Sequence, residues 1–152
     1  MIGGGFAERG SFATEERYHR PTMGVPGAKQ GDKVVGVDTH VIMIPSPGGP
    51  VPTPMPMPFS GTLDGSLSSS IMIDNQPAAV KGSTASNQPQ HIPAGGPFQT
   101  PPTNQGTVDA GSDSVFFDNK KAARMGDQVK TCNDPTEAPN GVIIASGTVL
   151  IG

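Results

Sequence analysis

The amino-acid sequence predicts an all-β protein, and two features of its composition carry that prediction. Ile and Val together number 21 against 3 Leu, and branching at Cβ suits a pleated strand better than a helix. Gly and Pro, with 21 and 17 copies in 152 residues, interrupt the chain so often that its strands must be short. A net charge of −3 gives little self-repulsion and favours a compact state. Large apolar residues are nevertheless few for one domain, so we expect an additional stabilising element.

The chain divides into an N-terminal arm and one β domain. Residues 1–24 mix charges with glycine and have neither strand nor helix periodicity, which predicts an arm preceding a domain over residues 25–152. Within that domain, residues 45–58 and 93–106 contain too many prolines for central strands. We expect these two stretches to form ordered loops or extended covers.

A repeated pattern of a small polar lead and three apolar residues predicts related β-hairpins. The three copies begin at Ser68, Ser112 and Ser146. The first two continue in step, 44 residues apart, into Asp74-Asn75 and Asp118-Asn119. Asp-Asn between strand-like arms is typical of a tight turn. The third copy follows an apolar run, which predicts a closing hairpin with its turn near residues 145–147.

A second repeat places one potential metal ligand in each unit. His40 and His91 each follow the glycine of their unit by nine residues, and Cys132 follows its own by six. Three units packed around a common pseudo-threefold axis would bring the three side chains together. Zn²⁺ accepts imidazole nitrogen and thiolate in a tetrahedral site, and each ligand removes freedom from a long loop. A shared metal is therefore the additional stabilising element that we expect.

Other interpretations of these residues stay open. A lone cysteine can be a small buried hydrophobe, and loop histidines can be solvated side chains. His19 lies in the arm, outside the repeats and close to two arginines, where an exposed side chain is the simplest interpretation. Cys132 and His91 could form a nucleophilic pair, but no nucleophile elbow, phosphate loop or carboxylate pair accompanies them. We therefore expect no catalytic residue.

Several classes of protein are disfavoured by composition. The longest apolar run, residues 41–44, is far shorter than the roughly 20 residues that cross a bilayer. The N-terminus lacks the basic and then apolar order of a signal peptide, so synthesis and retention in the cytoplasm are expected until the protein is exported. Ten Lys and Arg in an acidic chain give no nucleic-acid footprint. A single cysteine excludes an internal disulfide.

Four motifs give the sequence a family resemblance. They are Asp38-Thr39-His40, Pro77-Ala78-Ala79, Lys121-Ala122-Ala123-Arg124-Met125-Gly126-Asp127 and the ending Ser146-Gly147-Thr148-Val149-Leu150-Ile151-Gly152. In this order, over residues 34–152, the chain resembles PAAR-repeat proteins, the sharpened tips of contractile injection machines related to phage tails and type VI secretion. It departs from the motif that names the family in having Lys121 where proline is usual.

The resemblance implies a small cone of short β-hairpins with pseudo-threefold internal repeats, stapled by a metal near its vertex. The broad base would cap a trimeric β-helical spike protein, with Val115, Phe116, Val149 and Ile151 as candidates for that face or for the core behind it. One monomeric tip with three repeats would match one trimeric spike.

The family's metal is held by three histidines and a cysteine, and His40, His91 and Cys132 occupy ligand-like positions. The remaining histidine tends to lie in a Pro-His segment, which reads Pro56-Met57-Pro58-Phe59 here. The fourth ligand therefore stays open between His19, Met57, water and a site with only three protein ligands. Zinc is the expected ion, with iron as the alternative.

The expected function is a non-enzymatic, membrane-piercing tip that sharpens the spike of a contractile injection system. Cargo effectors would attach through the arm or the loops, the target membrane would be contacted transiently, and the particle would act outside the cell or inside a target cell. A small metal-dependent or Cys-His hydrolase or toxin is the main alternative, and a β-rich structural or adhesin fragment is a third.

Overall fold

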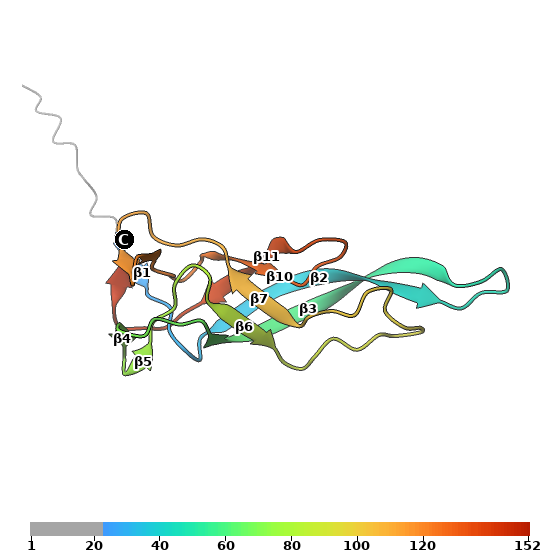
Figure 1. Ribbon diagram of the computed structural model, residues 1–152, viewed down its shortest axis with the longest axis horizontal. Helices are drawn as coiled ribbons and strands as arrows, with labels where there is room; N and C mark the ends of the chain where they lie inside the picture. Colours follow the sequence, from blue (N-terminus) through green and yellow to red (C-terminus); the bar gives the residue numbers. More distant parts are fainter. Residues whose placement is uncertain (1–22) are drawn as a thin grey trace, which may run out of the picture.

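Twelve strands and no helix make up the part of the chain that the computed structural model describes, residues 23–152. The molecule tapers from a broad end, which holds the C-terminus, to a single hairpin at the narrow end (Figure 1). The predictions of an all-β fold and of a cone are confirmed. The expected arm lies outside the described residues, apart from its last two positions, and so does His19.

Six antiparallel strands close into a barrel in the order β10-β11-β2-β3-β6-β7. They are β2 (Lys33–Ile44), β3 (Val51–Gly65), β6 (Thr84–Asn87), β7 (Gln105–Val108), β10 (Gln128–Thr131) and β11 (Ala138–Ile144). Alternate residues point inward, as period-2 burial along β2 and β3 shows. The interior is filled chiefly by small and β-branched side chains around one aromatic ring, that of Phe59.

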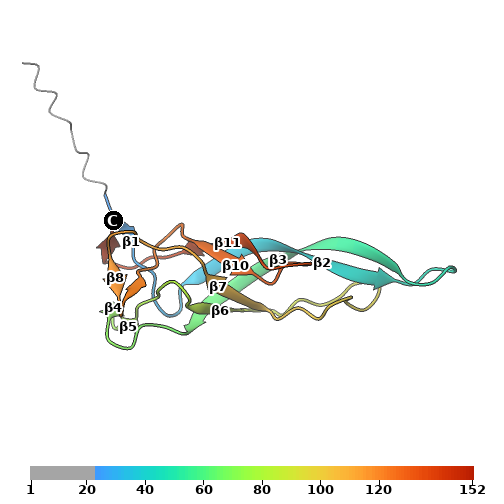
Figure 2. The same cartoon turned by 45° about the horizontal axis from the view of Figure 1, so that its top comes forward.

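Three two-stranded pairs form the broad end (Figure 2). They are β4 (Met72–Ile73) with β5 (Gln76–Pro77), β8 (Phe116–Phe117) with β9 (Lys120–Lys121), and β1 (Val25–Pro26) with β12 (Leu150–Ile151). The first two pairs are the hairpins predicted from the repeat. Their Asp-Asn turns have φ angles of 49° and 64° at Asp74 and Asn75, and of 51° and 63° at Asp118 and Asn119. Positive φ at both central residues is what a type I′ turn requires, so this prediction is confirmed.

The third pair differs from the predicted closing hairpin. β12 pairs with β1, from the other end of the described chain, and not with β11 across residues 145–147. Val25 lies opposite Ile151 and Pro26 opposite Leu150. The prediction was wrong because it assumed a local partner, whereas the threefold arrangement gives β12 a partner that is distant in sequence.

A ring of backbone hydrogen bonds marks the pseudo-threefold axis. The Ala28 N–H donates to the Ala123 carbonyl at 2.9 Å, Ala123 to Ala79 at 3.0 Å, and Ala79 back to Ala28 at 2.9 Å. All three alanines are fully buried. Because three segments of the chain approach one another here, a larger side chain would meet backbone or other core atoms. The three repeats predicted from sequence therefore meet in space.

Each unit then turns at a glycine that joins the base to the barrel. The φ angles are 88° at Gly31, 95° at Gly82 and 86° at Gly126, a region that side chains rarely adopt. The N–H group of each glycine donates at 2.9 Å to a carbonyl of a barrel strand, and those acceptors are Leu63, Val108 and Ile143 respectively. The same small motif thus ties the base to the barrel three times.

The first proline-rich stretch is a strand, contrary to the prediction. β3 passes through four alternate prolines, Pro52, Pro54, Pro56 and Pro58, while it pairs with β2 along its length. Alternate residues direct their N–H positions to the same edge, so the missing donors all face away from β2. Pairing of β3 with β6 begins only at Gly61, so the edge along the prolines has no strand partner among residues 23–152. Proline blocks that edge without interrupting the hairpin.

The second proline-rich stretch lies outside the strands until Gln105, as predicted. Part of it covers the free edge of β2 in the narrow half of the cone. Met43 N donates to the Pro97 carbonyl at 2.9 Å, and Gln99 N donates to the Val41 carbonyl at 2.8 Å. In residues 23–152 no helix is long and apolar enough to cross a membrane.

Candidate metal centre

Strand β2 brings two polar side chains into the interior where it leaves the barrel. Asp38 and His40 are two residues apart, so they share the inward face of the strand, and both are fully buried. The pairing of β2 with β11 ends at Gly36. Beyond that point the hairpin continues past both residues toward the narrow end. The site therefore lies below the vertex, between the barrel and the projecting hairpin.

The loop between β6 and β7 supplies His91. Asn104, in the left-handed region with φ of 54°, closes this loop. Its side-chain oxygen accepts hydrogen bonds from the His91 backbone N–H at 2.8 Å and from the Asn87 side-chain amide at 3.1 Å. This arrangement fixes the backbone of His91 beside β3.

Cys132 follows β10 directly, and the residues after it are held along β2. Thr39 N donates to Asn133 Oδ1 at 2.7 Å, and Val41 N donates to Asp134 Oδ2 at 3.2 Å. In return, Asp134 N donates to the Thr39 carbonyl at 2.8 Å. The edge of β2 beyond Gly36, which no strand of residues 23–152 covers, thus positions the thiol.

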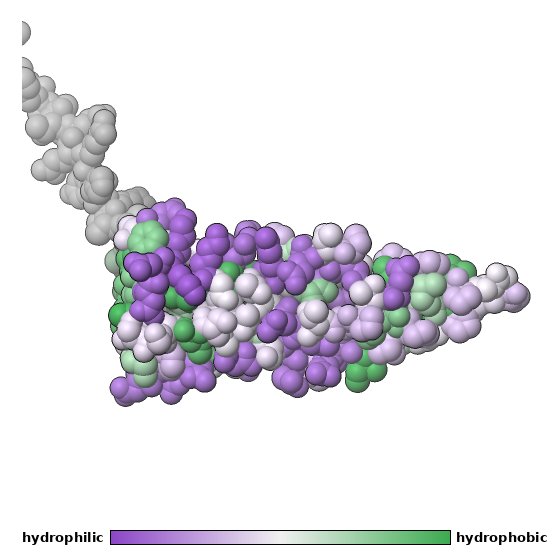
Figure 3. Space-filling view, viewed as in Figure 1, coloured by the Kyte–Doolittle hydropathy of each residue, from purple (hydrophilic) through white to green (hydrophobic). Residues whose placement is uncertain are grey.

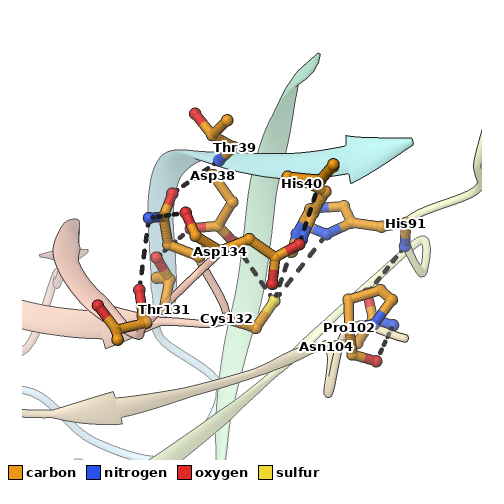
Figure 4. Close-up of polar contacts among 12 residues, drawn as sticks. Asp38, Thr39, His40, His91, Pro102, Asn104, Thr131, Cys132 and Asp134 are labelled. Atoms are coloured by element: carbon orange, nitrogen blue, oxygen red, sulfur yellow. Dashed lines mark hydrogen bonds and ion pairs between the residues drawn. The ribbon is translucent and has the colours of Figure 1, made fainter. Parts of the chain in front are cut away.

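The thiol of Cys132 lies at the centre of the cluster (Figure 4). Its Sγ is 3.9 Å from His40 Nε2, 3.9 Å from His91 Nδ1 and 3.3 Å from Asp38 Oδ2. One ligand atom from each of the four residues lies within 4.8 Å of all the others. Tetrahedral zinc with ordinary bond lengths separates sulfur and nitrogen ligands by about 3.6 Å. The two sulfur–nitrogen distances are within a few tenths of an ångström of that value.

Hydrogen bonds on the far side of each imidazole fix which nitrogen is free. His40 Nδ1 donates to the carboxylate of Asp134 at 3.2 Å, and His91 Nε2 donates to the carbonyl of Pro58 at 3.1 Å. Carboxylates and carbonyls only accept, so the proton of each neutral ring lies there. The lone pairs of His40 Nε2 and His91 Nδ1 are then directed toward Cys132, which is the outer-shell arrangement of metal-binding histidines.

Asp38 supplies the strongest physical argument for a cation. Its carboxylate is fully buried, and none of the ion pairs among residues 23–152 includes it. One oxygen accepts a hydrogen bond from the Thr131 hydroxyl and the other faces Cys132. A buried carboxylate is costly unless a cation compensates it. The donor set of one thiolate, two imidazoles and one carboxylate fits Zn²⁺ or Fe²⁺.

The environment of the thiol argues against a Cys-His nucleophile. Burial raises the pKa of Cys132 to about 11, and the Asp38 carboxylate contributes in the same direction. Only 5 % of the residue is exposed. A catalytic cysteine needs a lowered pKa and access to substrate, whereas here the thiol would ionise only if a cation replaced its proton.

The structure brings together the three residues predicted as ligands, and it places Asp38, which was not predicted, in the same group. Asp38 is thus a further candidate beside the alternatives of Met57, water and a site with three protein ligands, while His19 lies outside the described residues. Met57 lies opposite Asp38 in the register of β2 and β3 and lines a hollow beside His91. The signal for Asp38 was available, because Asp-x-His on a strand directs both side chains to one face.

Fold and site together define a small conical β protein with a pseudo-threefold base and a buried group able to hold a metal ion. Residues 99–152 match the family model of the PAAR motif. The predicted resemblance to PAAR-repeat proteins is confirmed by this match, which includes Cys132 and the second and third copies of the base strand pattern. Comparison with curated proteins gives no match.

Proposed function

We propose that this protein is the structural tip of the spike of a contractile injection system. The PAAR motif supports a spike-tip role and is consistent with a protein that is not an enzyme. The observation that carries the proposal furthest is the pseudo-threefold base, built around the ring of Ala28, Ala79 and Ala123. A monomer with three related units can present similar contacts to each subunit of a trimeric β-helical spike protein.

The base offers an apolar ring for that contact. The strands β4, β8 and β12 occupy equivalent places in the three base pairs, and the first residue of each is exposed to nearly the same extent. The exposed fractions are 56 % for Met72, 54 % for Phe116 and 59 % for Leu150. Apolar surface lies along the broad end of the molecule (Figure 3). Of the four base candidates from sequence, Phe116 and Val149 are exposed, Val115 is half-buried, and Ile151 belongs to the core behind the base.

We propose that the candidate metal centre stabilises the narrow half of the cone. Its four residues come from β2, from the loop after β6 and from the segment after β10. A bound ion would cross-link these three segments at the level where the barrel stops. A tip that transmits force must keep its strands paired. Beyond Gly36 few apolar side chains are buried, so apolar packing alone stabilises this region weakly.

Further parts of the role complete the proposal. The tip would be made in the cytoplasm, assembled on the particle, and carried to a target membrane that it touches only briefly. Cargo effectors would attach through loops or the N-terminal arm. Either a type VI apparatus or an extracellular phage-tail-like particle is compatible with this tip.

Co-purification with a trimeric β-helical spike protein from the same organism tests the role. The triple variant Met72→Ser, Phe116→Ser and Leu150→Ser is expected to bind the spike protein at least roughly tenfold more weakly, because each of these side chains would bury apolar area on docking. The control variant, Val37→Ser with Ile92→Ser, removes exposed apolar residues from outside the base and is expected to bind normally. Equal binding by both variants, or no binding by the unmodified protein, would overturn the proposal.

A further inference from the structure

A lysine-lined hollow lies beside the base hairpin formed by β8 and β9. It has a volume of about 380 Å³. Its lining consists of Lys81, Gly82, Phe116, Asn119, Lys120 and Lys121. Three of the seven Lys and Arg residues in the described part of the chain therefore surround one depression, in a protein whose net charge is −3.

Two of these lysines lack an ionic partner within the described part of the chain. Lys121 pairs with Asp113 at 2.6 Å, but no Asp or Glu of residues 23–152 lies within 4.0 Å of the ammonium groups of Lys81 or Lys120. The backbone beneath them is fixed, because Lys81 N donates to the Lys121 carbonyl at 2.8 Å. An ordered surface thus holds two cations that no acidic residue of the described chain neutralises.

The internal repeat provides a control for whether the fold needs these charges. Counted from the alanines of the axial ring, Lys81 corresponds to Gln30 and Met125 in the other two units. Through strand pairing, Lys120 corresponds to Gln76 and Val25, and Lys121 to Pro77 and Pro26. The same backbone forms twice without any of these lysines, so folding does not require them.

We propose that this hollow binds an acidic segment of a partner protein, one copy per tip. The ammonium groups of Lys81 and Lys120, which have no ionic partner among residues 23–152, suit carboxylates. The exposed ring of Phe116 offers an apolar contact beside them. The hollow lies at the broad end, opposite the end that would meet a membrane, which favours a protein over a lipid surface. The chain's net negative charge disfavours a nucleic acid. Since the other two units lack the lysines, the base would carry one such site and not three.

This inference does not depend on the identity of the spike. Fluorescence anisotropy with a labelled ten-residue peptide, alternating glutamate and serine around one central phenylalanine, tests it directly. The unmodified protein is expected to bind the peptide, with affinity falling as salt is raised. The double variant Lys81→Gln with Lys120→Gln, which installs the residue type of other units, is expected to bind roughly fivefold more weakly.

A matched control removes the same charge elsewhere. Lys33→Gln with Lys130→Gln changes two cations of the barrel strands β2 and β10 and is expected to leave peptide affinity within about twofold. Equal losses in both double variants would overturn the proposal, as would failure of the peptide to bind or equal binding of a peptide with glutamine for glutamate. Tighter binding to phosphatidylserine vesicles or to single-stranded DNA than to the peptide would also overturn it. Loss of spike binding by the double variant Met72→Ser with Leu150→Ser, which keeps Phe116, would separate the two surfaces if peptide binding is kept.

Discussion

The base and the narrow half of this cone are held together by different interactions. At the base, three related segments close a ring of hydrogen bonds around Ala28, Ala79 and Ala123, and every unit repeats the same turn. Beyond Gly36 no such symmetry remains. One long hairpin continues alone, and the loops on either side of it are held to the edge of β2.

The interiors differ in the same way. The barrel and base bury apolar side chains such as Phe59, Leu63 and Ile143, whereas the first inward residues of β2 beyond the barrel are Asp38 and His40. An apolar core stabilises without a ligand, but a buried carboxylate needs a compensating charge. Two regions of one short chain thus require two sources of stability, and only the narrow half is expected to depend on a metal ion.

The largest expected effect is the loss of stability caused by Phe59→Ala, which truncates the aromatic side chain in the barrel core. Phe59 is the largest of the fully buried side chains, and such truncations cost about 3–5 kcal/mol in the free energy of unfolding. Chemical denaturation should show one global transition at lower denaturant. Phe98→Ala is the comparison variant in the narrow half. The Phe98 ring is only partly buried there and lies edge-on to the His40 ring, with 5.7 Å between the ring centroids. An equal loss in both variants would contradict the division into two regions.

A second prediction concerns the axial ring. Ala79→Leu inserts a large side chain where three backbones meet, and overpacking of this kind costs about 1–3 kcal/mol. Thermal unfolding measures the loss. Ala94→Leu, at an exposed loop position, is expected to change stability by less than about 0.5 kcal/mol. A tolerated Ala79→Leu would mean that the ring is not tightly packed.

The third prediction tests the outer shell of the metal centre. Asp134→Asn weakens the acceptor that orients His40, and substitutions of this kind cost about 10- to 100-fold in metal affinity. Competition with a chromophoric chelator gives the affinity. Glu137→Gln, an exposed residue close by on the same segment, makes the same charge change and should leave affinity unaltered. If both variants bind metal as the unmodified protein does, Asp134 has no positioning role.

The smallest effect is a pH dependence at the base. Hydrogen bonds from Ser68 and Ser70 lower the pKa of Asp118 from its ordinary value of 3.8, and a bond from Thr148 does so for Asp74. A carboxyl group whose pKa is lower in the folded state stabilises the fold above its unfolded pKa, and that contribution disappears as pH falls through the folded pKa. Stability should therefore decline below about pH 4.

Replacing the carboxylate tests this contribution. Asp118→Asn should flatten the acid limb of the stability curve measured by denaturation at a series of pH values. Ser70→Ala, which keeps the carboxylate but removes one donor, should give an intermediate slope. An unchanged acid limb in Asp118→Asn would show that these base contacts do not contribute.

The sequence predicted the features that local chemistry determines. Cβ-branched residues indicated strands, Asp-Asn pairs indicated turns, and the repeat of His40, His91 and Cys132 indicated side chains that meet. All three conclusions rest on short-range pattern or on repetition, and the structure reproduces the strands, the turns and the convergence.

The features that were missed depend on partners distant in sequence. Proline density concealed β3, because whether a missing N–H matters depends on which edge has a partner. The pairing of β12 with β1 joins the two ends of the described chain. Asp-x-His places Asp38 on the same strand face as His40, but its contacts with Thr131 and Cys132, more than ninety residues away in the chain, could not be predicted locally.

The central claim is that one metal ion, held by Asp38, His40, His91 and Cys132, fastens the narrow half of the cone to a base that is stable without it. Metal analysis by mass spectrometry of the purified protein, alone and as the Cys132→Ala variant, tests it most directly. About one equivalent of zinc or iron per chain is expected, lost in the variant. Hydrogen exchange on the same samples should then show deprotection of residues 38–58 with the barrel still protected. Less than about half an equivalent of metal, unaffected by Cys132→Ala, would contradict the account.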